Sequence, residues 1–350
     1  MTDADEIALF AFRVWTYKQG EVVSLLVHLG DRLRLFEAMA DGADVTAHEL
    51  AERTGLQERW LLEWLRGVAA AELLQTDDGE RFRLPAVARA VLVDEEHLAF
   101  SAGAFAGGYP SDYVDRLAEA FVTGIGPDYD SRGAAGAHTT ERMLGPWARS
   151  ALVPVILPRL DGVVAKLEAG GRVLDLGCGG GIAMAAIAEA FPAAEVHGVD
   201  LSRHAIDRAT ANLAAVPNAS ARLGRAEDVT EAASYDLVLS FDCLYDMTRT
   251  ADAIAAVRRA IAPDGTWLVK EIRCWPTWEQ NKANPMLAMF YGLSVSSCMA
   301  SALSEPGGAG LGTVGLPGDL LRSMAEAAGF TRFTVHDVED PANLYYEIRP

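Results

Sequence analysis

The chain has 350 residues, half of them hydrophobic, which is enough for one large core and a second, smaller one. Its formal net charge at pH 7 is −19, and a surface of that sign repels phosphate backbones, so nucleic acid is not an expected partner. No apolar run reaches the roughly 20 residues that a membrane span requires, and the acidic N-terminus lacks the build of a signal peptide. We therefore expect a cytoplasmic protein without membrane attachment.

The cysteines are few and widely spaced. They form no CxxC pair and have no nearby ladder of histidines, so the sequence predicts reduced thiols and no metal site. The four are Cys178, Cys243, Cys274 and Cys298.

Residues 1–97 predict a small helical domain. A first helix is expected from about Ile7 to Ala40, and Thr46 to Glu49 has the form of a capping box that opens a short second helix ending at Gly55. A third helix is expected from Gln57 to Leu74, and residues 73–84 suggest two short strands around an Asp-Gly turn. Three helices followed by a hairpin are typical of a winged helix.

The third helix bears on whether this domain binds DNA. Its charged residues, Glu58, Arg59, Glu63 and Arg66, cancel one another, whereas a helix that binds phosphate would be basic. We therefore favour dimerisation or substrate covering over DNA binding, and the apolar stripes of the N-terminal helices predict a homodimer. The expected core stripe of the third helix is Trp60, Leu61, Trp64, Leu65 and Val68.

Residues 98–167 predict a Gly- and Ala-rich helical connector, with helices over 113–121 and 143–157 that could wall a substrate pocket. From 168 to 350 strands and helices alternate, which predicts an α/β domain whose parallel sheet has helices on both faces. The last two strands must form an antiparallel hairpin because no crossover helix separates them. Residues 274–315 interrupt the alternation and suggest a lid. The expected strands are 172–176, 195–200, 220–224, 235–241, 266–273, 333–338 and 343–348.

The strongest motif follows the first of these strands. Asp175 lies near the end of the strand, and Gly177, Gly179 and Gly181 open the next helix. Glycines let a backbone approach a ligand closely, and a helix N-terminus offers unpaired amides to an anionic group. A dinucleotide site would have its third glycine where this chain has Ile182, which disfavours NAD. An acid two residues before the first glycine suits a ligand with both an ammonium and a carboxylate, such as S-adenosylmethionine (SAM).

Two further segments fit the same ligand. Asp200 ends the second strand, where a carboxylate can accept both ribose hydroxyls, and Leu201 beside it could cover an adenine face. Residues 225–228 follow the third strand, where an adenine edge would lie.

These residues resemble the class I SAM-dependent methyltransferases. Residues 54–65, Phe241 to Asp246, Asn284-Pro285, Gly310 to Gly312 and Asn343-Leu344 also resemble a bacterial subgroup that joins a winged-helix domain to this fold. The resemblance implies a Rossmann-like, seven-stranded domain over residues 168–350 that binds SAM and releases S-adenosylhomocysteine (SAH). The expected cofactor-binding residues are Asp175, Gly177, Cys178, Gly179, Gly181, Asp200, Leu201, Ala226, Glu227, Phe241 and Asp242.

The catalytic residues are less clearly marked. Methyl transfer from a sulfonium needs alignment and a dry pocket, and a base only where the acceptor carries a proton of high pKa. Tyr245, Asp246 and Glu271 follow the carboxyl ends of two central strands and are the expected catalytic residues, although a structural role is equally open for each.

The chain departs from the subgroup at three places. The subgroup often has His-Asp at positions 245–246 and His-Cys at 297–298, where this chain has Tyr245-Asp246 and Ser297-Cys298. Many class I enzymes also place an acid at position 225 to contact the adenine amine; here Arg225 stands there, and Glu227 or Asp228 could substitute.

The sequence thus predicts a SAM-dependent methyltransferase for a small acceptor, and the aromatic and methionine residues of 274–315 favour an apolar or aromatic one. Two alternatives stay open: a SAM-binding winged-helix transcriptional regulator, and an enzyme of this fold that catalyses a different reaction.

Overall fold

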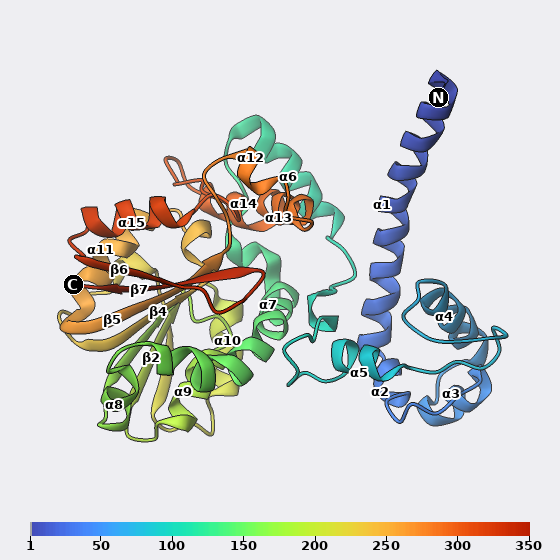
Figure 1. The fold of residues 1–350 in the computed structure, drawn as a ribbon, viewed down its shortest axis with the longest axis horizontal. Helices are drawn as coiled ribbons and strands as arrows, with labels where there is room; N and C mark the ends of the chain where they lie inside the picture. Colours follow the sequence, from blue (N-terminus) through green and yellow to red (C-terminus); the bar gives the residue numbers. More distant parts are fainter. Residues whose placement is uncertain (1) are drawn as a thin grey trace. The chain divides into compact units, whose positions relative to one another are not determined.

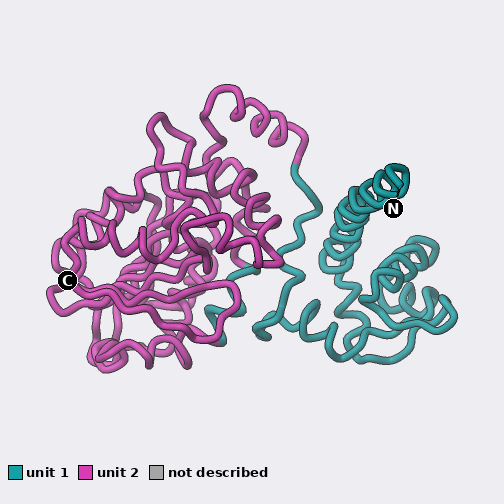
Figure 2. Tube along the Cα trace, turned by 45° about the horizontal axis from the view of Figure 1, so that its top comes forward, with its two compact units in different colours: residues 1–109, 142–150 teal, residues 110–141, 151–350 magenta. Residues whose placement is uncertain are grey.

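The computed structural model describes residues 2–350, which form two compact units (Figure 2). The first contains the described residues up to Tyr109 together with Arg142–Ser150, and the second contains Pro110–Glu141 and Ala151–Pro350. The segment predicted as a connector, 98–167, is therefore divided between the units.

The first unit is a small helical domain. Thr46 and Glu49 form the predicted capping box: the Thr46 hydroxyl accepts the Glu49 amide at 3.1 Å, and the Glu49 carboxylate accepts the Thr46 amide at 2.7 Å. Gly55 ends that helix in the left-handed conformation, φ 72°, also as predicted. Its helices are α1 (Asp3–Arg32), α2 (Leu35–Ala38), α3 (Ala47–Thr54), α4 (Glu58–Ala70), α5 (Ala86–Leu92) and a 3-10 turn η1 (Ala102–Ala104).

The core of this unit surrounds α4. Its buried stripe is Leu61, Trp64, Leu65 and Val68, and the Trp64 ring lies 5.2 Å from that of Phe36. Of the described residues, no helix is both long and apolar enough to cross a bilayer.

Four sequence predictions for this unit are wrong. The first helix does not continue to Ala40, because Arg34 adopts a left-handed backbone, φ 58°, and separates α1 from α2. The third helix ends at Ala70, before Glu72 at φ 61° turns the chain. Trp60 is 80% exposed, since at 100° per residue it lies about 90° from the centre of the buried stripe. The expected wing strands reduce to isolated bridges, Val45 with Phe82 and Gln75 with Arg83.

A seven-stranded sheet forms the centre of the second unit, in the order β3-β2-β1-β4-β5-β7-β6 (Figure 1). The strands from β1 to β5 are parallel, and β7 runs antiparallel to both β5 and β6, so the predicted hairpin is confirmed. The strands are β1 (Arg172–Leu176), β2 (Glu195–Asp200), β3 (Ala219–Leu223), β4 (Tyr235–Phe241), β5 (Ile261–Ile272), β6 (Arg332–His336) and β7 (Asn343–Arg349).

The fifth strand begins earlier than predicted. Ile261 already pairs with Tyr235, and the register then jumps to Thr266 opposite Leu237. The expected Pro263-Asp-Gly265 turn is thus an irregularity within β5 rather than the turn before it.

The helices flank the sheet and cover one end of it. Those of the layers are α8 (Val163–Glu168), α9 (Ile182–Ala190), α10 (Arg203–Asn212), α11 (Thr250–Ala260) and α15 (Gly318–Ala327). The segment 274–315 contains α12 (Trp278–Asn281), α13 (Leu287–Leu293), a π-helical turn η7 (Ser294–Cys298) and α14 (Met299–Ala302). This segment lies beside α6 (Ser111–Thr123), where the Tyr113 hydroxyl donates to the carbonyl of Ser296 at 2.9 Å (Figure 1).

One predicted helix of the connector is not continuous. Residues 143–157 are divided between the end of α7 (Gly133–Trp147) and a π-helical stretch over Ala148–Ile156, with Pro146 and Pro154 inside them. Proline removes a backbone donor and clashes with the preceding turn, which explains the irregular winding.

The strand order determines where a ligand can bind. The chain runs outward from β1 through β2 to β3 and then returns to place β4 beside β1. In such sheets a crevice opens at the carboxyl ends of the strands at the point of reversal, here between β1 and β4. The loops after these two strands contain the predicted site residues.

Candidate cofactor and acceptor site

Three left-handed glycines shape the loop after β1. Gly177, Gly179 and Gly181 have φ of 71°, 54° and 75°, which other residues rarely adopt. A side chain at position 177 would meet Cys243 of the neighbouring loop at 2.9 Å, so Gly177 lets the two loops pack. A side chain at 179 would meet nothing within 4 Å, so the backbone there is open to an approaching ligand.

Asp200 joins this loop to the loop after β2. Its carboxylate, 8% exposed as a residue, accepts the amide of Gly179 at 2.8 Å and the amide of Ser202 at 2.8 Å. Each carboxylate oxygen has a further lone pair with which it can accept a hydroxyl. Burial raises the pKa of Asp200, and the two amides oppose that rise. Leu201, beside it, is 44% exposed.

Asp175 is a second buried acid at the same edge of the sheet. It is 2% exposed, and burial together with the neighbouring Asp200 raises its pKa to about 7. A cationic group placed between the two carboxyls would relieve both effects by favouring the charged form.

Two more buried acids follow β4 and β5. One oxygen of Glu271 accepts the amide of Leu244 at 3.0 Å, and the other, Oε2, has no hydrogen-bond partner among the described residues. Burial, with Asp242 next in importance, raises the pKa of Glu271 well above its usual value. Burial and then Asp200 do the same for Asp246. Asp246 adds to the rise in the pKa of Glu271, and burial followed by Asp246 and Glu271 raises the pKa of the Cys298 thiol.

Of the predicted catalytic residues, Tyr245 is the one that packs within the hydrophobic core. It is 6% exposed and packs in the main core of the second unit, and burial raises the pKa of its phenol well above the usual value. Its carbonyl accepts the amide of Gly312 at 3.0 Å, so Tyr245 also holds the end of the 274–315 segment.

Comparisons with known proteins agree with this geometry. Residues 167–329 match the family model described as a methyltransferase domain, and residues 21–93 match the model described as an Rv2258c-like winged HTH domain. Residues 167–329 are thus similar to methyltransferase domains, and residues 21–93 are similar to a winged-helix domain.

Individual relatives are distant. The curated trans-aconitate 2-methyltransferase of Methylobacterium radiotolerans is 31% identical over 163 residues, which cover 46% of this chain and 59% of that protein. The chain thus spans about three fifths of the length of this relative.

Two solved structures share the fold along nearly the whole chain. A candidate O-methyltransferase from Nostoc punctiforme has a TM-score of 0.72 at 19% identity and covers 98% of each chain. Human N-acetylserotonin methyltransferase in complex with SAM has a TM-score of 0.69 at 16% identity and covers 97% of each chain.

The side chains of two expected cofactor residues, Asp242 and Cys178, contact other parts of the protein. Asp242, which follows the buried Phe241 and has φ 50°, is ion-paired with Lys270 and accepts a hydrogen bond from the side-chain Nδ2 of Asn343 at 2.5 Å. This buried contact joins β4, β5 and β7. The Cys178 thiol packs against β2, where a side chain at Gly198 would meet it at 2.8 Å, so Cys178 can serve a ligand mainly through its backbone.

The loop after β3 differs from the expectation for an adenine site. It begins with Arg225 and forms a 3-10 turn, η5 (Ala226–Asp228), in which Ala226 is buried. Glu227, expected to approach an adenine amine, accepts the Arg225 guanidinium at 2.6 Å.

Sequence reasoning missed several residues of the segment before and within α7. Asp130 accepts the Ser202 hydroxyl at 2.5 Å, and Glu141 accepts two hydrogen bonds from Arg208, at 2.6 and 2.7 Å. Glu141 also lies so close to Gly180 that any side chain at position 180 would overlap it. These partners are more than 60 positions apart, so no local pattern reveals them.

The cysteines all carry free thiols. In the described part of the chain, no three His, Cys, Asp or Glu side chains are grouped so that they could hold a metal ion.

The raised pKa of Asp175 predicts a pH dependence of stability. Asp175 keeps its proton up to about pH 7 in the folded state, whereas in the unfolded chain its carboxyl titrates near 4. The folded state therefore binds more protons in this range, and the free energy of unfolding contributed by Asp175 falls as pH rises through it. We therefore expect the free energy of unfolding of Asp175→Asn, relative to that of the wild type, to rise by roughly 1–4 kcal/mol between about pH 4 and pH 8. Denaturant titration at each pH measures this difference.

Asp207→Asn, at an exposed site on α10, is the matched control and should follow the wild type at every pH. If the two variants show the same pH dependence, Asp175 does not titrate as described.

Proposed function

We propose that this protein is a SAM-dependent methyltransferase that transfers a methyl group to a small molecule and releases SAH. The observation that carries the proposal is the pair of buried acids, Asp175 and Asp200, beside the open backbone of Gly179. A ligand that offers a ribose diol and a cationic amino acid portion complements this arrangement. The match of residues 167–329 to a methyltransferase domain supports the same assignment.

In this proposal, different residues contact different parts of the ligand. Asp200 would accept the ribose hydroxyls, and Asp175 would face the ammonium group. Gly177 and Gly179 would keep the loop backbone close to the ligand, with Gly181 opening α9 beyond them. Leu201 would lie on the adenine face, opposite Ala226 of η5. Each role uses a group whose position has been described.

Bound SAM supplies a methyl group activated by the sulfonium charge. The chain's own residues then align the acceptor, exclude water and, where the acceptor carries a proton, take it up. Glu271 Oε2 suits the last role because it is buried and makes no other hydrogen bond within the described residues. Burial raises the pKa of Glu271 and of Asp246 well above the usual values, which makes each a stronger base when it is deprotonated.

We propose an apolar or aromatic acceptor. Trp278 and Tyr291 lie with ring centroids 5.9 Å apart in the 274–315 segment and are 62% and 41% exposed. Met286 and Met289 of the same segment are also nearly half exposed. Flexible methionines beside aromatic rings adapt to apolar ligands of varied shape. Both the curated relative and the human neighbour are named for small-molecule acceptors.

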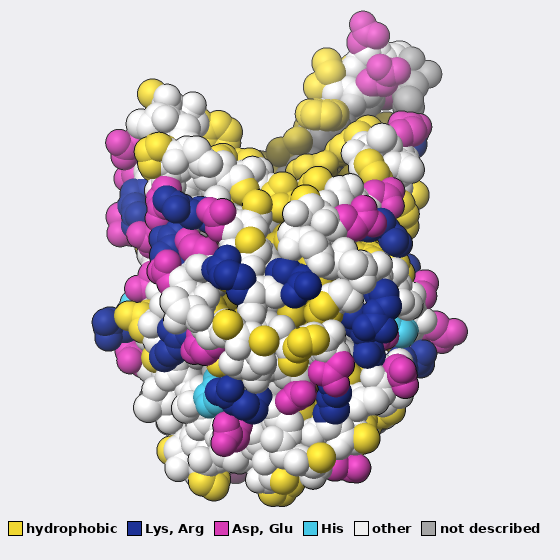
Figure 3. Space-filling view, turned by 90° about the vertical axis from the view of Figure 1, so that its left-hand side faces the viewer, with side chains coloured by type: hydrophobic (Ala, Val, Ile, Leu, Met, Phe, Trp, Pro, Cys, Tyr) yellow, Lys and Arg dark blue, Asp and Glu magenta, His cyan; other side chains and the backbone are white. Residues whose placement is uncertain are grey.

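The regulator alternative finds less support in the first unit. On α4, Arg59 pairs with Glu63 at 2.5 Å, and Arg66 pairs with Glu80. These cations are therefore already neutralised on the helix that would enter a DNA groove. Figure 3 draws a face of the second unit, and there too Lys and Arg side chains are interspersed with Asp and Glu. The other alternative, a reaction other than methyl transfer, assigns no role to the buried acids Asp246 and Glu271 that follow β4 and β5.

Calorimetric titration with SAM and SAH tests the cofactor assignment. We expect both to bind the wild type, and Asp200→Ala to weaken binding about ten- to a hundredfold, since hydrogen bonds to a charged group are lost. Asp207→Ala removes the same charge from an exposed site of α10 and should bind like the wild type. Absence of binding to folded wild-type protein would refute the proposed function.

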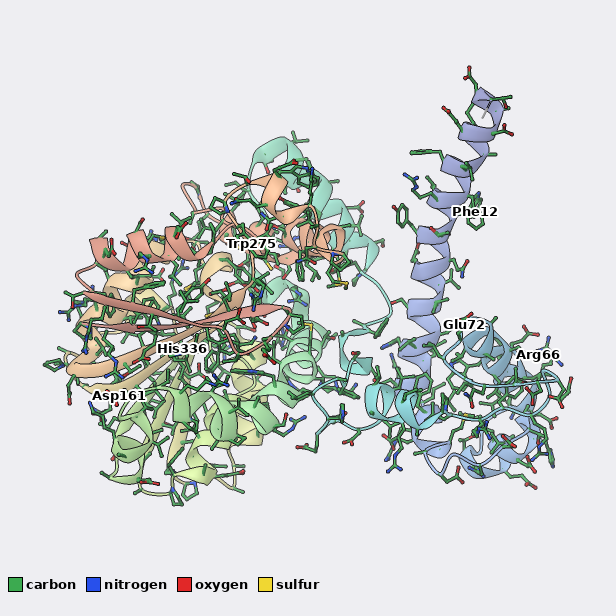
Figure 4. All side chains as sticks on the ribbon, viewed as in Figure 1. Phe12, Arg66, Glu72, Asp161, Trp275 and His336 are labelled. Carbon is green, nitrogen blue, oxygen red and sulfur yellow. The ribbon has the colours of Figure 1, made fainter. Side chains whose placement is uncertain are left out.

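We also propose that the protein is a homodimer assembled through α1. After its acidic first turn, α1 carries exposed hydrophobic side chains on all sides over residues 7–17, and Phe12 projects from the helix (Figure 4). A helix that is hydrophobic all round is normally buried, and exposed apolar patches of this size mark interfaces. A second copy offers the same apolar helix as a partner. The side chains concerned, each more than half exposed, are Ile7, Leu9, Phe10, Phe12, Val14, Trp15 and Tyr17.

Light scattering tests this assembly. The wild type should have about twice the 37.5 kDa mass of one chain, and Phe12→Glu combined with Trp15→Glu should have the mass of one. Arg13→Glu, on the same helix, controls for added negative charge. A single-chain mass for the wild type would rule the dimer out.

A further inference from the structure

Arg225 makes contacts that an adenine-binding loop does not require. Its Nε donates to Glu227 at 2.6 Å, Nη1 donates to Glu305 at 2.7 Å, and Nη2 donates to Thr248 at 2.6 Å. These acceptors belong to three segments: η5 itself, the loop after β4, and the turn that follows α14. A guanidinium is rigid and planar, so three such bonds fix the segments relative to one another better than a single ion pair would.

Backbone hydrogen bonds strengthen the link between the same segments. The amide of Ala309 donates to the carbonyl of Thr248 at 2.9 Å, and the amide of Gly312 donates to the carbonyl of Tyr245 at 3.0 Å. Leu311 packs against the core cluster that contains Ala226 and Tyr245. Residues 299–315 are therefore held to the loops after β3 and β4 by side chains, backbone and apolar packing together.

This same segment adjoins the acids on the acceptor side. Thr313 is 3% exposed, and its backbone amide donates to the Ser294 hydroxyl at 3.3 Å. The preceding Gly312 donates to the carbonyl of Tyr245, the residue before Asp246. One end of residues 299–315 is thus bonded to the backbone next to Asp246, one of the proposed catalytic acids, and Glu305 within the segment contacts the proposed adenine loop through Arg225.

We propose that Arg225 is a positioning residue that ties the acceptor-side segment 299–315 to the adenine side of the cofactor site, so that cofactor and acceptor strengthen each other's binding. The inference rests on the proposed function for the ligand at η5. A ligand that orders η5 orders Arg225, and Arg225 then holds Glu305. Because such coupling is reciprocal, an acceptor held under the segment favours the cofactor by the same factor.

Hydrogen–deuterium exchange of the full chain, with and without SAH, tests the proposal. In the wild type SAH should slow exchange both in the loop 177–181 and in 299–315, where Ala309 and Gly312 donate to the loop after β4. In Arg225→Gln the protection of 177–181 should remain, while that of 299–315 should fall by about fivefold or more, the lower end of coupling between sites.

Two further variants make the result specific. Glu305→Gln should reproduce the effect of Arg225→Gln, and the double variant should add nothing, because both remove one contact. Arg222→Gln, at a half-exposed arginine of β3 that pairs with Glu231, is the matched control and should behave as the wild type.

The outcomes separate this proposal from the proposed function. SAH can protect 177–181 in both proteins and also protect 299–315 equally in Arg225→Gln and wild type. That result overturns the coupling and leaves the methyltransferase assignment intact. Absence of SAH protection in wild-type 177–181 overturns the cofactor assignment and the coupling built on it. In that case the ligand-free variants still test the role of Arg225. If residues 299–315 exchange faster in Arg225→Gln than in Arg222→Gln, Arg225 holds the segment; if the two rates are equal, it does not.

Discussion

Carboxyl groups crowded at the carboxyl edge of a parallel sheet are the feature on which this site depends. Asp175, Asp200, Asp246 and Glu271 are all held there, and burial raises the pKa of each. Keeping acids in such a place is costly unless they are protonated or meet positive charge. In the proposed function, bound SAM would supply that charge, and a carboxyl near the acceptor would take up the acceptor's proton.

The backbone permits this crowding because the strands and glycines fix the loops around it. The reversal of strand order places the loops after β1 and β4 side by side, and Gly177 allows them to touch. Asp200 then accepts amides from the loop after β1 and from its own loop. Lys270 neutralises Asp242 within the sheet, which leaves the other acids to the ligand. The site is thus held by elements of the central sheet.

Much of the fold could be predicted because its signals are local. Strands β1, β2 and β4 begin and end where the sequence places them, since buried parallel strands read as apolar runs bounded by turn residues. The capping box at Thr46 and the left-handed Gly55 are equally local. The left-handed Arg34 that breaks the first helix was not predictable, because arginine is a good helix former and gives no sign of that backbone.

The parts of the site that could not be predicted depend on long-range contacts. Arg225 and Glu305 are 80 positions apart, and Glu141 and Arg208 are 67 apart. Each residue by itself looks like an ordinary surface charge, and only the fold shows which partner it meets. The proposed cofactor residues could be named from the sequence because glycines and strand-end acids form a compact pattern. The 274–315 segment, proposed to cover the acceptor, has no comparable pattern.

A crystal structure of the protein with SAH tests the central claim most directly. We predict density for SAH over the loop 177–181, with its ribose hydroxyls on Asp200, its ammonium group near Asp175 and its adenine between Leu201 and Ala226. SAH bound elsewhere, or bound there without contact to Asp200 or Asp175, would contradict the claim that these two buried acids form the cofactor site.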